Sequence, residues 1–238
     1  MKKIGIIGAM AMEVSTLKEE MFDSQQIEKA GMIFYYGSLQ GCEVVVVQSG
    51  IGKVNAAACT QLLIDLFQVD CVINTGVAGS LDNNINVGDI VISTDAVQHD
   101  MSTSAGAFGD ADGQIPGLPV FSFVADEELR KLAVENCQKY LTDIQVFQGR
   151  VLTGDIFLAD HHRKEALVQE FAGICVEMEG AAIAHVAYLN QLPFLIIRAI
   201  SDKADGSAHT DFPTFAARAA ERSVELLLHM LSSITQHT

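Results

Sequence analysis

Acidic side chains follow three of the apolar runs in this sequence. Glu13 comes after "IGIIGAM", Glu177 and Glu179 end "AGICVEME", and Asp202 ends "PFLIIRAISD". Because ligands of open α/β sheets bind beyond the carboxyl ends of strands, polar groups at these places are candidates for a pocket. Carboxylates that converge there could exchange protons with a bound molecule or hold its polar groups. Each acid could equally be a solvated first-turn residue or a helix cap, and the residues alone leave both interpretations open.

The stretch "VEMEGAAIAHVA" carries two of these carboxylates in front of an alanine-rich apolar run. If residues 172–179 are extended, a period of two puts Cys175, Glu177 and Glu179 on one side, with Val176 and Met178 on the other. In a helix, positions two apart would diverge, and only one acid would point into a pocket. The strand interpretation therefore predicts that both carboxylates leave the sheet together.

Other short motifs are less specific. "NTGVAGS" at 74–80 contains Gly76 and Gly79, which would let the backbone approach a ligand closely or would form a tight strand-to-helix turn. "GIIG" and "SGIGK" lack the spacing of a dinucleotide fingerprint or a P-loop, so a nucleoside triphosphate site is poorly supported. His161 and His162 are adjacent near a predicted helix start, without further ligands at useful spacing, and no metal site is expected.

Composition narrows the classes of function. Thirty Asp and Glu residues against fifteen Lys and Arg give a formal charge of -15. Such a charge repels nucleic acid phosphates and anionic membranes, so neither is an expected partner. No apolar segment reaches the roughly 18 residues of a membrane span, and a soluble protein is expected. The N-terminal "MKKIGIIGAMAMEV" imitates a signal peptide, but its apolar run at 4–8 falls below the usual minimum of about seven residues.

Length and cysteine usage bear on domain count and compartment. The 238 residues, 49% of them hydrophobic, predict a single domain spanning 1–238. The cysteines are odd in number, widely spaced and set in apolar segments, unlike a disulfide framework. They predict small core residues in a reducing cytoplasm, and they are Cys42, Cys59, Cys71, Cys137 and Cys175.

The elements that must position the acids are short β-branched runs alternating with helical patterns. Strands covered on both faces are predicted at 4–10, 43–50, 69–76, 172–179 and 193–202. Helices are predicted over 53–67, 126–139 and 213–234, the first with Val54, Ala58, Leu62, Leu63, Leu66 and Phe67 facing inward. Segments 31–50 and 87–98 read as strands joined without helices. We therefore expect a mixed, largely parallel sheet inside one three-layer α/β/α sandwich, with 99–119 as a functional lid or partner-contacting loop.

Eight segments in order carry a family resemblance. They are "IGIIGAM" with Glu13, "SGIGKVNAA", "NTGVAGSL", "VGDIVIS", "GQIPG", "TGDIF", "VEMEGAAIAHV" and "RAISDKAD". Together they resemble bacterial 5'-methylthioadenosine/S-adenosylhomocysteine nucleosidases, from Lys3 to about the final helix. The resemblance implies a nucleoside phosphorylase-like sandwich and a homodimer. It also implies hydrolysis of the adenine–ribose bond of methylthioadenosine, S-adenosylhomocysteine and 5'-deoxyadenosine, without metal or cofactor.

The resemblance also implies roles for individual residues. Glu13 matches the carboxylate that positions and activates water, Asp202 the acid that protonates adenine at N7, and Glu179 the residue that binds the ribose hydroxyls. As an acid, Asp202 would need a raised pKa. Phe157 is expected to stack on adenine, the Leu158 backbone to read its edge, Met178 to pack under the ribose and Phe212 to line the 5'-substituent pocket. The matching pocket segments also contain Met10, Ile51, Ala78, Gly79, Glu177, Arg198 and Ser201.

Several features of the sequence bear on the pocket for the 5'-substituent. They are two residues that a second subunit would contribute and two departures from the family pattern. Phe108 and Pro116 resemble residues that a second subunit lends to its partner's pocket. "HDMSTSAGAFG" is longer than the loop expected there, and Val77 stands where many members have serine. These differences leave the preference among 5'-substituents open.

Other functions on the same fold remain alternatives. A phosphorylase would need arginines to hold phosphate, but the N-terminal third contains none, and Glu13 would repel the anion. A nucleosidase for another purine compound, such as futalosine or AMP, is a second alternative. A nucleoside-binding protein without catalysis is a third, and the three retained carboxylates argue against it.

Overall fold

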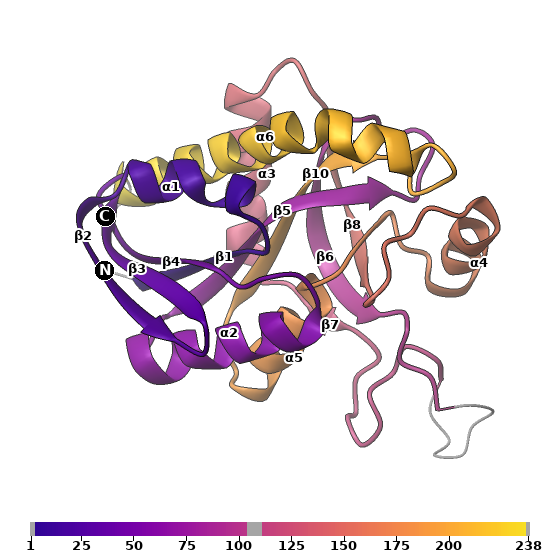
Figure 1. Ribbon diagram of the computed structural model, residues 1–238, viewed down its shortest axis with the longest axis horizontal. Helices are drawn as coiled ribbons and strands as arrows, with labels where there is room; N and C mark the ends of the chain where they lie inside the picture. Colours follow the sequence, from indigo (N-terminus) through magenta and orange to yellow (C-terminus); the bar gives the residue numbers. More distant parts are fainter. Residues whose placement is uncertain (1–2, 104–110, 237–238) are drawn as a thin grey trace.

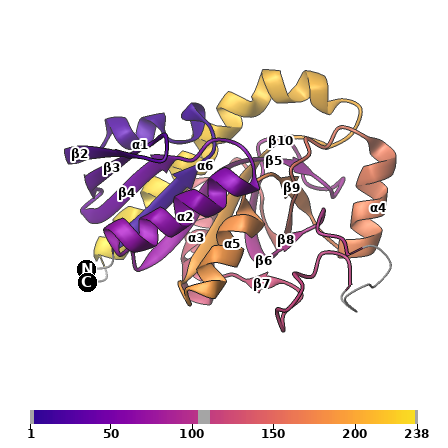
Figure 2. The same cartoon turned by 60° about the horizontal axis from the view of Figure 1, so that its bottom comes forward.

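The computed structural model describes residues 3–103 and 111–236, in which a mixed sheet is covered by helices (Figures 1 and 2). The strands are β1 (Lys3–Gly8), β2 (Phe22–Lys29), β3 (Met32–Leu39), β4 (Cys42–Gln48), β5 (Cys71–Ser80), β6 (Ile90–Gln98), β7 (Phe123–Val124), β8 (Val146–Thr153), β9 (Cys175–Glu177) and β10 (Phe194–Asp202). The helices are a short 3-10 helix (Ala11–Glu13), α1 (Ser15–Glu19), α2 (Lys53–Phe67), α3 (Glu127–Tyr140), α4 (His161–Phe171), α5 (Gly180–Leu189) and α6 (Ala208–Gln236).

The layers are those of the expected sandwich. Helices α2 and α5 pack together against one face of the sheet, while α6 packs on β5 and β10 from the other face, with α3 beside it. Both interlayer cores are built from the β-branched residues of strands buried on both faces. The five cysteines are buried, as expected for small core residues.

The order of the strands is β10-β6-β8-β9-β5-β1-β4-β3-β2, and β10 also pairs with β5. This extra pairing closes β5, β9, β8, β6 and β10 into a ring of five strands. Strands β4, β1, β5 and β10 run parallel, as do β6, β8 and β9, whereas β10–β6 and β5–β9 are antiparallel. The meander β2–β3–β4 extends the sheet away from the ring.

Strand β5 and helices α2 and α6 each differ from the sequence prediction. Strand β5 runs on through "NTGVAGS" to Ser80, where a turn into a helix or a loop was expected, and all ten of its residues are buried. Helix α2 has the predicted bounds, and Leu63 is buried as predicted, with Leu62 and Phe67 partly buried against the core. Val54, however, is 80% exposed, and the remaining buried positions are Ala56, Cys59 and Thr60. Helix α6 begins before Pro213, at Ala208.

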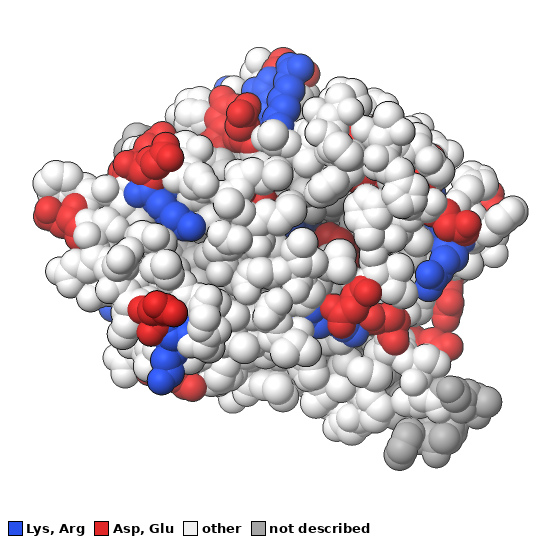
Figure 3. All heavy atoms as spheres, viewed as in Figure 1, with Lys and Arg blue, Asp and Glu red and all other residues white. Residues whose placement is uncertain are grey.

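The surface and the long connection agree with the charge and composition. Lysine, arginine and acidic side chains are interspersed on the face seen in Figure 3, without a continuous basic area. The described part of 99–119 contains no helix or strand. Within residues 3–103 and 111–236, no helix has both the length and the apolar composition needed to cross a membrane.

Candidate active site

A cavity of about 350 Å³ lies beside the strand ring. Its wall contains many of the residues singled out from the sequence, namely Met10, Glu13, Ile51, Ala78, Gly79, Phe157, Glu177, Met178, Glu179, Ser201, Asp202 and Phe212. Ala9, Val77 and Val176 complete it. The wall is mostly apolar with a few convergent polar groups, which is the usual composition of a small-molecule site.

Glu13 is held by backbone donors alone. Its Oε2 accepts hydrogen bonds from the N–H groups of Ala9 at 2.7 Å and Met10 at 2.8 Å, and its Oε1 accepts one from Val77 at 3.1 Å. The residue is 1% exposed, so it is not the solvated first-turn residue that the sequence left open. Burial raises the pKa of this carboxyl, while the charge of Arg198 and the N–H donors oppose the rise.

Gly76 lets Glu13 and Arg198 approach the same point of β5. A Cβ at this position would collide with both the guanidinium and the carboxylate. The two charged groups can therefore lie against this point of the strand only because this residue has no side chain.

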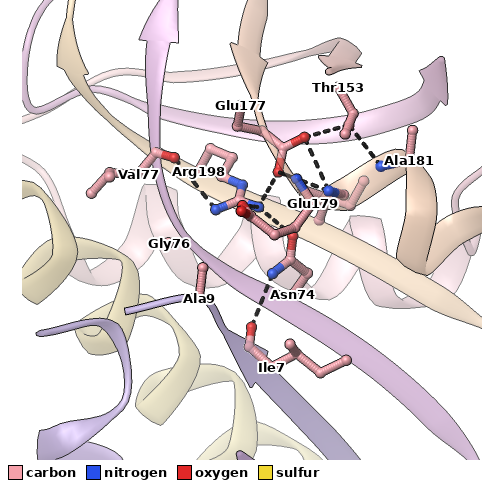
Figure 4. A network of polar contacts seen from close by, with 12 residues as sticks. Ile7, Ala9, Asn74, Gly76, Val77, Thr153, Glu177, Glu179, Ala181 and Arg198 are labelled. Carbon is pink, nitrogen blue, oxygen red and sulfur yellow. Dashed lines mark hydrogen bonds and ion pairs between the residues drawn. The ribbon is translucent and has the colours of Figure 1, made fainter. Parts of the chain in front are cut away.

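Arg198 is the centre of a buried polar network (Figure 4). Its guanidinium donates to Glu177 and to Asn74, and its Nη2 lies 3.5 Å from the Oε2 of Glu179. Arg198 is 1% exposed and is absent from the cavity wall, so it lies behind the two glutamates rather than in reach of a ligand. Its partners offset the large cost of burying a charge.

Glu177 is committed to protein partners. Besides Arg198, it accepts hydrogen bonds from the Thr153 hydroxyl and from the N–H groups of Glu179 at 3.1 Å and Gly180 at 2.8 Å. The Gly180 N–H belongs to the first turn of α5, where a carboxylate is favoured by the helix dipole. Thr153 in turn accepts the Ala181 N–H at 2.7 Å. Glu177 therefore anchors the start of α5.

Glu179 is one of the residues that line the cavity. Its Oε1 accepts the Gly52 N–H at 2.9 Å, and the residue is 4% exposed. Burial, followed by the negative charge of Glu177, raises the pKa of Glu179 to about 7, against the pull of Arg198.

The route by which the two glutamates meet differs from the prediction. Strand β9 covers only Cys175–Glu177, and Glu179 is the N-cap residue of α5, with φ -132° and ψ -41°. The extended period of two therefore does not continue to Glu179. The two carboxylates converge because both lie against Arg198.

Asp202 is the last residue of β10. It pairs with Gly79 of β5 and lines the cavity. Its Oδ2 accepts the Ser201 hydroxyl at 2.8 Å, and its Oδ1 accepts the Ala204 N–H at 2.8 Å. Asp202 is 2% exposed. This burial raises the pKa of its carboxyl, although the two hydrogen bonds oppose the rise. Helix α6 begins six positions later, so Asp202 is not a helix cap.

The aromatic wall is partly open. Phe157 is 45% exposed, and its ring meets Phe212 edge-on with centroids 5.5 Å apart. The Leu158 side chain points instead into a buried cluster, so only its backbone is available to the cavity. Pro116 is exposed and does not line this cavity, and Phe108 lies outside the described residues. Among residues 3–103 and 111–236, no cluster of three His, Cys, Asp or Glu side chains is arranged to hold a metal ion.

Comparison with known proteins places this geometry in a family. A family model described as the phosphorylase superfamily matches residues 3–232. The 5'-methylthioadenosine/S-adenosylhomocysteine nucleosidase of Geobacillus sp. (strain WCH70) is 44% identical over 233 residues, which cover 98% of this chain and 99% of the relative. This chain belongs to the 5'-methylthioadenosine/S-adenosylhomocysteine nucleosidase family.

Solved structures agree with that family assignment. The nucleosidase of Neisseria meningitidis in complex with methylthio-immucillin-A has a TM-score of 0.93 and 38% identity, covering 98% of this chain and 100% of that one. The futalosine hydrolase of Helicobacter pylori strain 26695 has a TM-score of 0.91 and 35% identity, covering 98% of both chains. The fold and the mixed sheet expected from the sequence are thereby confirmed.

Two polar residues of this nucleosidase site were not singled out from the sequence. Asn74 accepts from Arg198 and donates to the Ile7 carbonyl at 3.0 Å, and Thr153 joins Glu177 to α5. Both lie in apolar strands, at β5 and at the end of β8, and both are fully buried. A polar residue inside an apolar run was the available signal, since buried polar groups need partners.

Proposed function

We propose that this protein hydrolyses the N-glycosidic bond of 5'-methylthioadenosine, S-adenosylhomocysteine and 5'-deoxyadenosine, releasing adenine and the 5-substituted ribose. The observation that carries the proposal is that Glu13, Glu179 and Asp202 face one cavity, and that the wall contains no lysine or arginine from the described residues 3–103 and 111–236. The family name of the relatives supports the first two substrates. The third rests on the family resemblance alone.

The chemistry assigns a different task to each acid. As the C1'–N9 bond breaks, its electron pair goes to adenine, and positive charge grows on the ribose. Asp202, whose pKa is raised by burial, donates a proton to adenine N7. Glu13 accepts a proton from water as the water oxygen bonds to C1'. Charge is thus stabilised at both ends of the breaking bond.

The other wall residues orient the substrate. Glu179 accepts hydrogen bonds from the ribose hydroxyls through the oxygen that faces the cavity. Phe157 stacks on adenine and the Leu158 backbone reads its edge, while Met178 packs beneath the ribose and Phe212 lines the 5'-substituent pocket. These placements hold the nucleoside in one reactive orientation, which is a large part of the catalysis.

Hydrolysis is favoured over phosphorolysis by the charges around the cavity. A phosphate would need cationic donors, and the one nearby guanidinium, Arg198, is occupied by Glu177 and Asn74. Glu13 and Glu179 would repel the anion. Water needs only the acceptor that Glu13 provides.

The proposal extends to assembly and compartment. Residues 1–238 act as one nucleosidase domain in a homodimer, in which Phe108 and Pro116 reach the partner's 5'-substituent pocket. Exposed apolar side chains beside the cavity, Ile51 at 52% and Val54 at 80%, support a partner surface here. The burial of all five cysteines as small core residues supports residence in the reducing cytoplasm.

The test is adenine release from methylthioadenosine in phosphate-free buffer, with the sugar product identified by mass. Free methylthioribose is expected from the wild type. Asp202→Asn and Glu13→Gln should each lower kcat by about 10²–10⁴-fold, the scale of a lost proton-transfer group. Asp143→Asn and Glu127→Gln make the same chemical changes at exposed ion pairs and should retain full activity.

Each other outcome points elsewhere. Turnover that requires phosphate and yields a sugar phosphate would make the protein a phosphorylase. Silence toward methylthioadenosine with release from futalosine would assign the other nucleosidase activity. Silence toward all of these compounds, with adenine binding retained, would indicate a binding protein.

A further inference from the structure

Three residues just outside the cavity hold one another in a closed set of hydrogen bonds. The Lys53 ammonium donates to Asp100 Oδ1 at 2.6 Å, the Asp155 N–H donates to Asp100 Oδ2 at 2.9 Å, and the Lys53 N–H donates to Asp155 Oδ1 at 2.8 Å. None of the three lines the cavity. We call this set the Lys53 triad.

Each member of the Lys53 triad belongs to a different segment. Lys53 is the first residue of α2, Asp100 follows β6, and Asp155 follows β8. The triad therefore ties together three connections that are far apart in sequence. Its geometry needs Gly52, since a Cβ there would lie 3.1 Å from Asp155 Oδ1 at a φ of +97°.

Two wall groups of the cavity are attached directly to this set. The Gly52 N–H, adjacent to Lys53, donates to Glu179 Oε1 at 2.9 Å. Phe157 lies two positions after Asp155 and lines the cavity. A shift of the triad would thus move both the donor that orients Glu179 and the ring that faces the ligand.

The Lys53–Asp100 pair of the triad is charged and largely shielded from water, whereas Asp155 is exposed. The side chains of Lys53 and Asp100 are each 18% exposed, and the ammonium also donates to Gln98 Oε1 at 3.3 Å. Burial raises the pKa of Asp100, but the hydrogen bonds from Lys53 and Asp155 outweigh it, so the net shift is downward. Charge-assisted bonds in such surroundings are short and strong, which suits them to fixing loop geometry.

We propose that Lys53 is a positioning residue of the reaction: its ammonium fixes Asp100 and Asp155, and through them the orientation of Glu179 and Phe157. This inference rests on the proposed function, because it assigns the two wall groups to ribose and base. Glu13 and Asp202 accept their hydrogen bonds from residues outside the triad. Loss of Lys53 therefore weakens substrate capture more than the proton transfers.

The kinetic test compares Lys53→Met with wild type on methylthioadenosine. KM should rise on the order of tenfold while kcat changes by less than about threefold, as expected when ground-state and transition-state binding weaken together. Lys53→Arg, which keeps a charged donor, should restore part of the loss. Lys131→Met removes an exposed ammonium paired with Glu127 and should leave both constants unchanged. A normal KM in Lys53→Met, or a fall in kcat alone, overturns the inference.

A second measurement needs no turnover. Hydrogen–deuterium exchange should speed up at residues 50–53 and 154–158 in Lys53→Met, and at neither segment in Lys131→Met. Unchanged exchange there overturns the inference even if the wild type acts on another nucleoside, whereas a wild type silent toward methylthioadenosine overturns only the proposed function. If Lys53→Met loses its cooperative unfolding transition, Asp100→Asn carries both tests, with smaller effects in the same direction.

Discussion

The acids of the cavity differ in the protein groups that surround them. Glu177 touches a guanidinium and several donors, whereas Glu179 has one backbone N–H and a more distant Arg198. Asp202 accepts one hydroxyl and one N–H. The proposed roles of these similar carboxyls, an anchor, a sugar ligand and a proton donor, follow from partners that differ in number and charge.

The raised pKa of Asp202 predicts the pH dependence of turnover. A carboxyl whose pKa is raised stays protonated to higher pH, so kcat should fall as pH rises through the pKa of Asp202. Glu13 must be ionised to accept a proton, and its own raised pKa should add a fall on the acidic side. Rates from about pH 5 to pH 9 would show the descending limb at rising pH in the wild type and its absence in Asp202→Asn. A wild-type rate that climbs across the whole range would argue against Asp202 as the acid.

Glu179 should cost stability at alkaline pH. Its folded pKa of about 7 lies above the ordinary 4.5, so the folded chain binds the extra proton, and stability is lost as pH rises between these values. Glu179→Gln should therefore unfold at a higher temperature than wild type at about pH 8, with the difference shrinking toward about pH 5. Thermal unfolding at both pH values checks it, with the exposed Glu28→Gln as control. A lower melting temperature at about pH 8 would show that the pull of Arg198 dominates.

At the scale of elements, the C-terminal end of α2 holds a residue in a strained backbone conformation that a substitution should relieve. Gln68, the C-cap of α2, is exposed and left-handed at φ 53° and ψ 50°, a conformation that glycine adopts without cost. Gln68→Gly should raise the free energy of unfolding by about 1 kcal/mol. The same change at Gln61, within α2, should lower it by about 1 kcal/mol. Denaturant titrations of both variants decide, and equal effects would refute the assignment to the cap.

The elements also show where sequence patterns sufficed and where they did not. Continuous β-branched runs predicted β1, β4 and β10, because burial on both faces leaves little choice of residue. The inward face of α2 was only partly predicted because α2 packs closely on the alanines of α5, so small residues such as Ala56 are buried beside Leu63 while Val54 lies outside. Helix α6 starts early because the Ser207 carbonyl accepts the Asp211 N–H at 3.0 Å, completing a turn ahead of Pro213.

The same limits apply to the site. Strand ends identified most of the cavity wall, since that rule depends on topology alone. They could not show that Glu177 would pair with Arg198, nor that the Thr153 hydroxyl would donate a hydrogen bond to Glu177. Such pairings join residues from different strands, and one sequence contains no signal for distance between them.

At the scale of the whole molecule, the strand ring predicts a gradient of local stability. Strands β5 and β10 are paired on both sides within the ring, and every residue of each is buried, whereas all eight residues of β2 are exposed. Amides of β5 and β10 should exchange only through global unfolding, and those of β2 much faster. Native-state hydrogen exchange in increasing denaturant measures the order. Equal protection of β2 and β5 would exclude a separately stable ring.

Closure of the ring also keeps the cavity away from the sheet edge at which strands of other copies could add. A strand added from another chain needs an unpaired edge, and β5, β9, β8, β6 and β10 each have ring neighbours on both sides. The far end of the sheet is β2, which is separated from the ring by β1, β4 and β3. Copies that joined edge to edge at β2 would leave every acid of the cavity in place, so such polymers would still turn over substrate.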